Sequence, residues 1–188
     1  HKVLRFADGE LSVLADLAGL VGGHPNDLVT DAHGHTFVGN FGFDLMGGGA
    51  PAPASLIRVD PDGTATVAAR ELHFPNGTVI TPDGSTLIVG ETTGNRYTAF
   101  DLAADGTLSN RRIWAAFGAL PQAETFLEGM ALIKVAPDGC SLDAEGHIWS
   151  ADALNNRCVR VAPGGEIVDE ITVPGDLGVY ACQLGGDD

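Results

Sequence analysis

The sequence predicts an all-β protein made of repeated blades of the kind found in β-propellers, and two observations support this prediction. First, three short segments, Pro25-Asn26-Asp27, Pro75-Asn76-Gly77 and Pro137-Asp138-Gly139, each stand eight residues ahead of a turn glycine, counted from the Asn or Asp. Second, four short β-prone runs separated by turn residues follow each of these segments, which we term openers. Such self-similarity is typical of repeat architectures, and four short strands per repeat are typical of a propeller blade.

The middle repeat shows the pattern most plainly. Its strands are expected at Thr78–Ile80, Thr86–Val89, Tyr97–Leu102 and Arg112–Phe117. The pairs Asp83-Gly84 and Asp105-Gly106 separate strands of this repeat. Because Asp-Gly pairs tolerate the positive φ that tight hairpins require, we expect consecutive strands to pair with one another.

The other two repeats follow the same order. In the first, strands are expected at Leu28–Thr30, Thr36–Gly39, Ser55–Val59 and Thr66–Ala68, with a Gly- and Pro-rich bridge over Gly47–Ala54. In the third, they are expected at Cys140–Leu142, His147–Ala151, Cys158–Val161 and Ile167–Val173. The chain therefore contains three whole blades.

The two ends of the chain predict partial blades. Val3–Phe6 and Leu11–Leu14 fit the last two strands of an earlier blade, and Val179–Leu184 fits the first strand of a later one. Since propellers close so that no sheet edge stays bare, we interpret residues 1–188 as a single, incomplete propeller domain, in line with the missing initiator Met. The alternative is a small ring in which the two partial blades pair to form a fourth blade.

Composition and charge limit the classes of molecule that we expect this protein to bind. Hydrophobic residues make up 44% of the chain, with 26 Gly and 10 Pro, which suits many strands and turns. The formal charge of -15, from 10 Lys and Arg against 25 Asp and Glu, disfavours nucleic acid and anionic membranes as partners and favours cations. No run approaches the roughly 20 apolar residues of a membrane span.

The cysteines and the absence of a visible leader bear on location. Cys140, Cys158 and Cys182 are odd in number, lack zinc-type spacing and fall within expected strands, so we expect reduced thiols and a cytoplasmic protein. Because the sequence does not start with Met, secretion stays open as an alternative.

The openers themselves predict a metal site. Each presents an oxygen-bearing side chain, Asn26, Asn76 or Asp138, at the same point of its repeat. Equivalent units in a ring can bring such side chains together at one place. Amide and carboxylate oxygens suit hard cations such as Ca²⁺, Mg²⁺ or Mn²⁺, with Zn²⁺ less favoured.

The chain resembles the gluconolactonase family that also contains regucalcin (senescence marker protein) and luciferin-regenerating enzyme. The similar segments are 74–77, 80–87, 105–112, 137–139, 142–146 and 181–182. The resemblance implies a six-bladed propeller with one divalent metal in its central channel, most typically Ca²⁺, of which this chain covers roughly three whole blades and two partial ones.

The resemblance also implies roles for individual residues. Asn26, Asn76 and Asp138 match three metal ligands of the family, and Asp138 matches the proton acceptor for water. A fourth ligand, a Glu, would lie upstream of this chain. The implied function is a metal-dependent hydrolase that opens lactones; the alternatives are hydrolysis of other esters and a propeller that serves only as a binding scaffold.

A substrate rim is expected at the same end of the blades. Because the second strand of each blade returns antiparallel to the first, Asn40, Glu91 and Asp152 end beside the openers, where they could contact substrate or merely cap hairpins. The resemblance matches Asp44 and His24 to positions that contact a small-molecule lactone.

The segment from Gly118 to Ala136 is longer than a usual connection between blades and carries several apolar residues. It directly precedes the third opener. We expect a partly helical insertion that forms either a lid over the site, favouring hydrophobic substrates, or a contact with a second subunit. The sequence leaves the oligomeric state and the particular lactone open.

Overall fold

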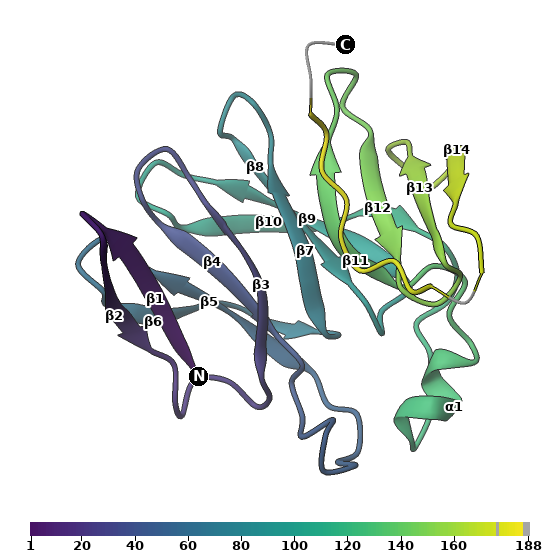
Figure 1. Ribbon diagram of the computed structural model, residues 1–188, viewed down its shortest axis with the longest axis horizontal. Coiled ribbons are helices and arrows are strands. Elements are labelled where there is room, and N and C mark those ends of the chain that lie inside the picture. Colours follow the sequence, from purple (N-terminus) through teal and green to yellow (C-terminus); the bar gives the residue numbers. More distant parts are fainter. Residues whose placement is uncertain (176, 186–188) are drawn as a thin grey trace.

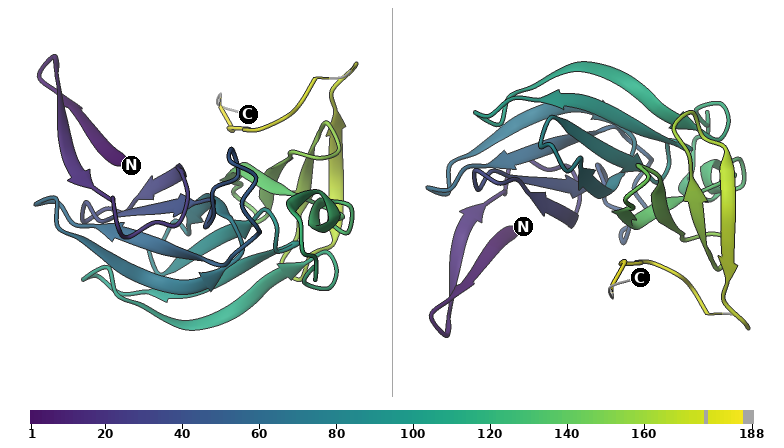
Figure 2. Two further views of the ribbon diagram at one scale, coloured as in Figure 1. Left: turned by 90° about the horizontal axis from the view of Figure 1, so that it is seen from below. Right: turned by 90° about the horizontal axis from the view of Figure 1, so that it is seen from above.

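The computed structural model describes residues 1–175 and 177–185. Three four-stranded antiparallel sheets and one two-stranded hairpin follow one another around an arc (Figure 1, Figure 2). In each larger sheet the strands pair in sequence order. This arrangement confirms the predicted all-β fold of repeated four-stranded blades.

Each blade begins at one of the three openers. The first blade consists of β3 (Pro25–Thr30), β4 (Thr36–Asn40), β5 (Ala54–Val59) and β6 (Ala65–Leu72). The second consists of β7 (Pro75–Ile80), β8 (Thr86–Glu91), β9 (Arg96–Leu102) and β10 (Leu108–Ala116). The third consists of β11 (Pro137–Leu142), β12 (Ile148–Asp152), β13 (Arg157–Val161) and β14 (Ile167–Thr172).

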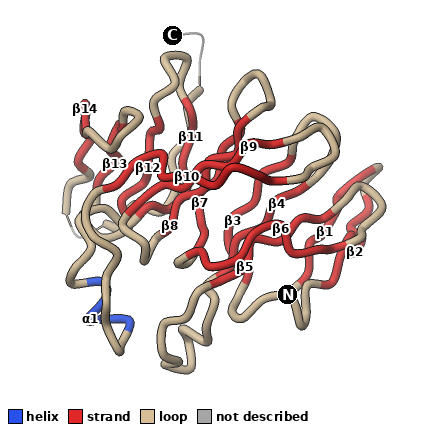
Figure 3. The backbone as a smooth tube through the Cα atoms, turned by 180° about the vertical axis from the view of Figure 1, so that it is seen from behind, coloured by secondary structure: helices blue, strands red, loops and turns tan. Residues whose placement is uncertain are grey.

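The hairpin at the start of the chain and one short helix complete the structure. The hairpin pairs β1 (Lys2–Ala7) with β2 (Glu10–Asp16), as the sequence predicts. The helix α1 (Phe126–Met130) lies in the insertion between the second and third blades (Figure 3), and Thr125 and Glu128 form a capping box at its start. Within the described residues no helix has the length and apolar character needed to cross a bilayer.

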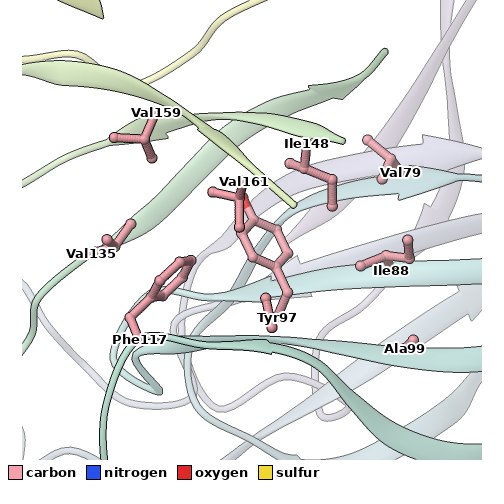
Figure 4. Close-up of a cluster of buried hydrophobic side chains, with 10 residues drawn as sticks. Val79, Ile88, Tyr97, Ala99, Phe117, Val135, Ile148, Val159 and Val161 are labelled. Carbon is pink, nitrogen blue, oxygen red and sulfur yellow. The ribbon is translucent and has the colours of Figure 1, made fainter. Parts of the chain in front are cut away.

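The hydrophobic cores lie between successive sheets. The largest cluster packs the second blade against the third, with the fully buried Tyr97 near its centre (Figure 4). The Tyr97 hydroxyl donates to Ser150 Oγ at 2.7 Å, so its polar end is satisfied inside the core. Two further clusters pack the first blade against the second and the hairpin against the first blade. The blades are thus held face to face, which fixes their inner strands relative to one another.

The segment expected to form a strand at Val179–Leu184 differs from the prediction. The structure assigns no strand between residues 177 and 185. The segment lies beside β11, where the Gly139 N–H donates to the Tyr180 carbonyl at 2.9 Å and the Leu184 N–H donates to Ser141 Oγ at 3.3 Å. A regular ladder of backbone hydrogen bonds, which defines a strand, is not formed along this described stretch.

Candidate functional site

All three openers adopt the same local structure, a β-bulge at the start of an inner strand. The opening prolines pair with the last residues of the second strands, as Pro25 with Asn40, Pro75 with Glu91 and Pro137 with Asp152. The next paired positions, such as Leu28 with Val38, lie three residues on along the inner strand but two along its neighbour. A bulge redirects side chains and is frequent beside active sites.

Glycines bring the three bulges close together. A Cβ on Gly77 would collide with the carbonyl oxygen of Asp138, and a Cβ on Gly39 would collide with the carbonyl oxygen of Pro75. The absence of a side chain at these glycines therefore lets the strands of neighbouring blades pack backbone to backbone. The residues in the three bulges consequently face one common space.

That space is a cavity of about 390 Å³. Its lining includes the three side chains predicted as ligands, together with one carboxylate that the repeat comparison does not single out. The lining residues are Asn26, Asp27, Phe41, Phe74, Asn76, Asp138, Gly139, Tyr180 and Ala181. The structure thus brings Asn26, Asn76 and Asp138 together, as the sequence predicts.

The two amides differ in how they are held. Both amide atoms of Asn26, Oδ1 and Nδ2, are buried and have no hydrogen-bond partner among the described residues. Asn76 donates from Nδ2 to Thr92 Oγ1 at 3.1 Å, and its Oδ1 accepts no hydrogen bond among the described residues. Because a buried polar group without a partner costs about 1–3 kcal/mol, the orphaned Asn26 amide indicates that a ligand belongs beside it.

Asp138 is the carboxylate of the third bulge. Burial raises the pKa of the Asp138 carboxyl above its usual value, and the nearby carboxylate of Asp27 adds to this rise. The Gly139 N–H and the Asn76 amide act in the opposite direction on this pKa. The Gly139 N–H donates to Oδ1 at 2.9 Å, so Oδ2 is the oxygen that accepts no backbone hydrogen bond among the described residues.

Asp27 is a site residue that the sequence comparison missed. It occupies the position that Gly77 and Gly139 fill in the other two openers. The comparison of openers by their first oxygen-bearing residue passed over it, although an Asp in place of two glycines was a visible signal. It places a second carboxylate on the cavity wall.

This donor set fits a hard divalent cation. Two amide oxygens and the carboxylates of Asp27 and Asp138 line one cavity, and the buried Asn26 amide lacks any other partner among the described residues. Within residues 1–175 and 177–185 no group of three or more His, Cys, Asp or Glu side chains converges as a metal site. The Asn and Asp side chains of the cavity lining offer amide and carboxylate oxygens, which Ca²⁺, Mg²⁺ and Mn²⁺ prefer.

The three residues that end the second strands turn away from the cavity. Asn40, Glu91 and Asp152 are fully buried, and none lines the cavity. Glu91 accepts from Arg96 at 2.8 Å and from the His73 N–H at 2.7 Å, while Asp152 accepts from Arg157 at 2.9 Å.

The bonds of Glu91 and Asp152 fix the chain just ahead of the second and third openers. Asp152 Oδ1 accepts from the Ala136 N–H at 3.1 Å, one residue before Pro137, and Asn40 Nδ2 donates to the Ser55 carbonyl at 2.6 Å. Of the two readings left open by the sequence, substrate contact and hairpin capping, the observed bonds correspond to capping.

Asp44 and His24 lie outside the cavity lining. Asp44 is exposed, and its Oδ1 accepts from the Gly47 N–H at 2.9 Å within its own loop. His24 is also exposed and lies edge-on to Phe41, with ring centroids 6.1 Å apart. His24 therefore touches the wall of the cavity from outside, whereas Asp44 is engaged in loop structure.

Comparison with known proteins places this site in a family. The family model described as the SMP-30/gluconolactonase/LRE-like region matches residues 1–188. The chain belongs to this family. Pentonolactonase XacC of Haloferax volcanii is 30% identical over 163 residues, which cover 87% of this chain and 50% of that protein. The predicted family is thus confirmed.

Solved structures of family members agree with the fold. A gluconolactonase from Xanthomonas campestris matches with a TM-score of 0.67 and 27% identity, covering 95% of this chain and 57% of that chain. A regucalcin from Agrobacterium tumefaciens, described as a calcium-binding protein, matches with a TM-score of 0.68 and 26% identity, covering 89% of this chain and 52% of that chain. The chain spans about half the length of these relatives and forms part of the family's six-bladed propeller.

Proposed function

We propose that this protein is a divalent-cation-dependent hydrolase that opens lactones in the cavity between the three bulges. The observation that carries the proposal is that equivalent bulges in three consecutive blades direct Asn26, Asn76 and Asp138 into one cavity. Relatives that bear lactonase names support the reaction class.

The cation would be held by oxygens of the three bulges. Asn26 and Asn76 offer amide oxygens, Asp138 offers a carboxylate oxygen, and Asp27 adds negative charge nearby. A bound divalent cation supplies a Lewis acid that polarises a lactone carbonyl and stabilises charge on its oxygen. Ca²⁺ is the favoured ion because its flexible coordination accepts both amide and carboxylate oxygens.

Asp138 performs the proton transfers. Its Oδ1 is held by the Gly139 N–H, so Oδ2 orients a water molecule and accepts one of its protons as the water oxygen bonds to the carbonyl carbon. The ring C–O bond then breaks, and the departing alkoxide oxygen takes the proton back from Oδ2.

A titration combined with a substrate panel tests the proposal. The whole protein is freed of metal, Ca²⁺, Mg²⁺, Mn²⁺ and Zn²⁺ are added in turn, and hydrolysis of lactones and linear esters is followed by acid release. We expect cation-dependent lactone opening, reduced roughly 10²–10⁴-fold in Asp138→Asn. Near-normal hydrolysis by Asp138→Asn with cation bound would show that another residue acts as the base. Cation binding without any turnover would instead support a binding scaffold, and faster cleavage of linear esters would support an esterase.

A further inference from the structure

The cavity beside the candidate ligands has an aromatic wall. Phe41 follows β4 directly and Phe74 precedes β7 directly, and both line the cavity. Their rings are stacked, with centroids 4.5 Å apart and planes inclined by 21°. The two residues come from different blades, so the wall is built where the first and second blades meet.

The backbone at Phe74 is held in an unusual conformation. Its φ is +57°, a left-handed value that bulky side chains rarely adopt. Residues kept in such conformations cluster at ligand-binding positions, where the surrounding structure maintains them. The Phe74 ring is thereby kept against Phe41, with 6% of its surface exposed.

The aromatic cluster continues beyond the cavity lining to Phe43, which is itself buried. Phe43 lies edge-on to Phe74 at 6.3 Å and contacts Phe126 of α1 at 6.0 Å, between ring centroids. A second cavity of about 350 Å³ lies between the loop after β4 and the start of α1, with Leu45 and Leu127 in its lining. The β4–β5 loop and α1 project from the same end of the sheets (Figure 1).

The polar side chains expected at the rim do not offset this apolar character. Asn40, Glu91 and Asp152 are buried in internal hydrogen bonds, and Asp44 bonds within its loop. Hydroxyl groups of a polyhydroxylated lactone that lie against the Phe41 and Phe74 rings would find no hydrogen-bond partner in these rings, which costs free energy for each group desolvated. An alkyl or aryl group would instead gain from burial there.

We propose that the substrates are lactones with an apolar alkyl or aryl substituent, and that the stacked Phe41–Phe74 pair binds this substituent. The inference rests on the proposed lactonase function and adds the substrate class to it. The ring carbonyl faces the amides and carboxylates of the bulges, and the substituent lies along the aromatic wall toward Phe43.

Kinetics on matched δ-lactones test this specificity. The whole protein is assayed with δ-valerolactone, a δ-lactone that carries a pentyl chain, and glucono-δ-lactone. Because each methylene group in an apolar pocket changes kcat/KM by roughly tenfold or more, we expect the pentyl compound to exceed both others by at least about tenfold. In Phe41→Ala and Phe41→Gln this preference should shrink toward unity, whereas Phe6→Ala, on the exposed hairpin, should retain it. A preference for glucono-δ-lactone would overturn the inference and leave the hydrolase proposal standing.

Binding provides a readout that does not depend on hydrolysis. Cyclohexanone and 2-pentylcyclohexanone share the ring size and the carbonyl but cannot be hydrolysed, and calorimetry gives the dissociation constant of each. We expect at least about tenfold tighter binding of the pentyl compound, lost in Phe41→Gln. Equal binding of the two ketones would overturn the inference. If the pentyl ketone binds more tightly but no lactone is hydrolysed, the aromatic wall binds apolar substituents as inferred and the hydrolase proposal is wrong.

Discussion

Asn76 donates from its Nδ2 to Thr92 Oγ1 at 3.1 Å, and the same hydroxyl donates to the Pro137 carbonyl at 2.6 Å. Thr92 therefore ties the candidate ligand of the second blade to the opener of the third. Asn76 and Thr92 are each only 5% exposed, so neither bond is replaced readily by solvent. The orientation of Asn76 depends on a residue that does not itself line the cavity.

Replacement of Thr92 by Val should weaken cation binding. The substitution preserves the shape of the side chain but leaves the Asn76 amide and the Pro137 carbonyl unpaired, at a cost of about 1–3 kcal/mol in the free energy of unfolding. We expect calorimetry to show weaker Ca²⁺ binding in Thr92→Val. Thr92→Ser, which retains the hydroxyl, should largely restore the affinity, and Thr93→Val on the next residue should leave it unchanged. Unaltered affinity in Thr92→Val would show that Asn76 needs no such orientation.

Asp27 should strengthen cation binding through its charge. A second carboxylate beside the two amides and Asp138 brings the negative charge of the site closer to that of a divalent ion. We expect Asp27→Asn to weaken Ca²⁺ binding by about tenfold in calorimetry, and the loss should diminish at high salt as screening increases. Asp62→Asn, in the turn between β5 and β6, is the matched control for loss of one surface charge. An equal effect in both variants would contradict a local role for Asp27.

Glu91 should matter for stability and leave cation binding unchanged. Its carboxylate is fully buried and paired with Arg96 at 2.8 Å. Removing one partner of a buried pair leaves the other charge uncompensated, so Glu91→Gln should lower the free energy of unfolding by about 3 kcal/mol in urea titrations. Ca²⁺ affinity of the folded variant should stay within about twofold of the original. If the variant is as stable as the original protein and its lactone selectivity changes, Glu91 contacts the substrate.

Much of the fold was predictable because the strands and turns of a propeller blade are encoded by residues close together in the sequence. Turn pairs such as Asp83-Gly84 and the strand-like runs between them fix each hairpin within a few residues, and the structure places β7 to β10 accordingly. The segment at Val179–Leu184 was harder, because its conformation depends on contacts with β11, more than forty residues earlier in the sequence.

The candidate site was predictable in part for the same reason. The repeat located Asn26, Asn76 and Asp138, but the bulges that redirect them arise from register with the second strands. The position of the strand-end acids Glu91 and Asp152 beside the openers leaves both substrate contact and hairpin capping open, and the residues that pair with them favour capping. Arg96 and Arg157 each follow their acid by five residues across a hairpin, and this spacing predicts the observed pairs.

The carboxylates in the turns make the free energy of unfolding depend on pH. Hydrogen bonds from the Thr81 hydroxyl, followed by those from Ser85, lower the pKa of Asp83 to about 2. A lowered pKa in the folded state means that the stabilisation is present above the unfolded pKa near 4 and is lost as the pH falls through about 2. We expect the stability difference between the original protein and Asp83→Asn, measured in urea, to shrink between pH 4 and pH 2. A difference that stays constant over this range would assign the effect to something other than this carboxyl.

Excision of the α1 insertion should change selectivity with little effect on stability. Asn95 holds both ends of the insertion, since its Oδ1 accepts from the Lys134 N–H at 3.0 Å and its Nδ2 donates to the Ala119 carbonyl at 3.4 Å. Because these ends meet at one side chain and α1 contributes no buried residue, residues 121–131 can be replaced by two glycines at a cost of about 1 kcal/mol or less.

Loss of Phe126 removes the far end of the aromatic cluster, so the ratio of kcat/KM for pentyl-substituted to unsubstituted δ-lactone should fall in this excision variant. A Gly164→Asn variant, in the turn between β13 and β14, changes a distant loop and should keep the original ratio. Light scattering on the same samples separates the lid from a subunit contact. Unchanged selectivity with a smaller particle mass would show that the insertion serves as an interface, whereas altered selectivity at constant mass supports a lid over the cavity.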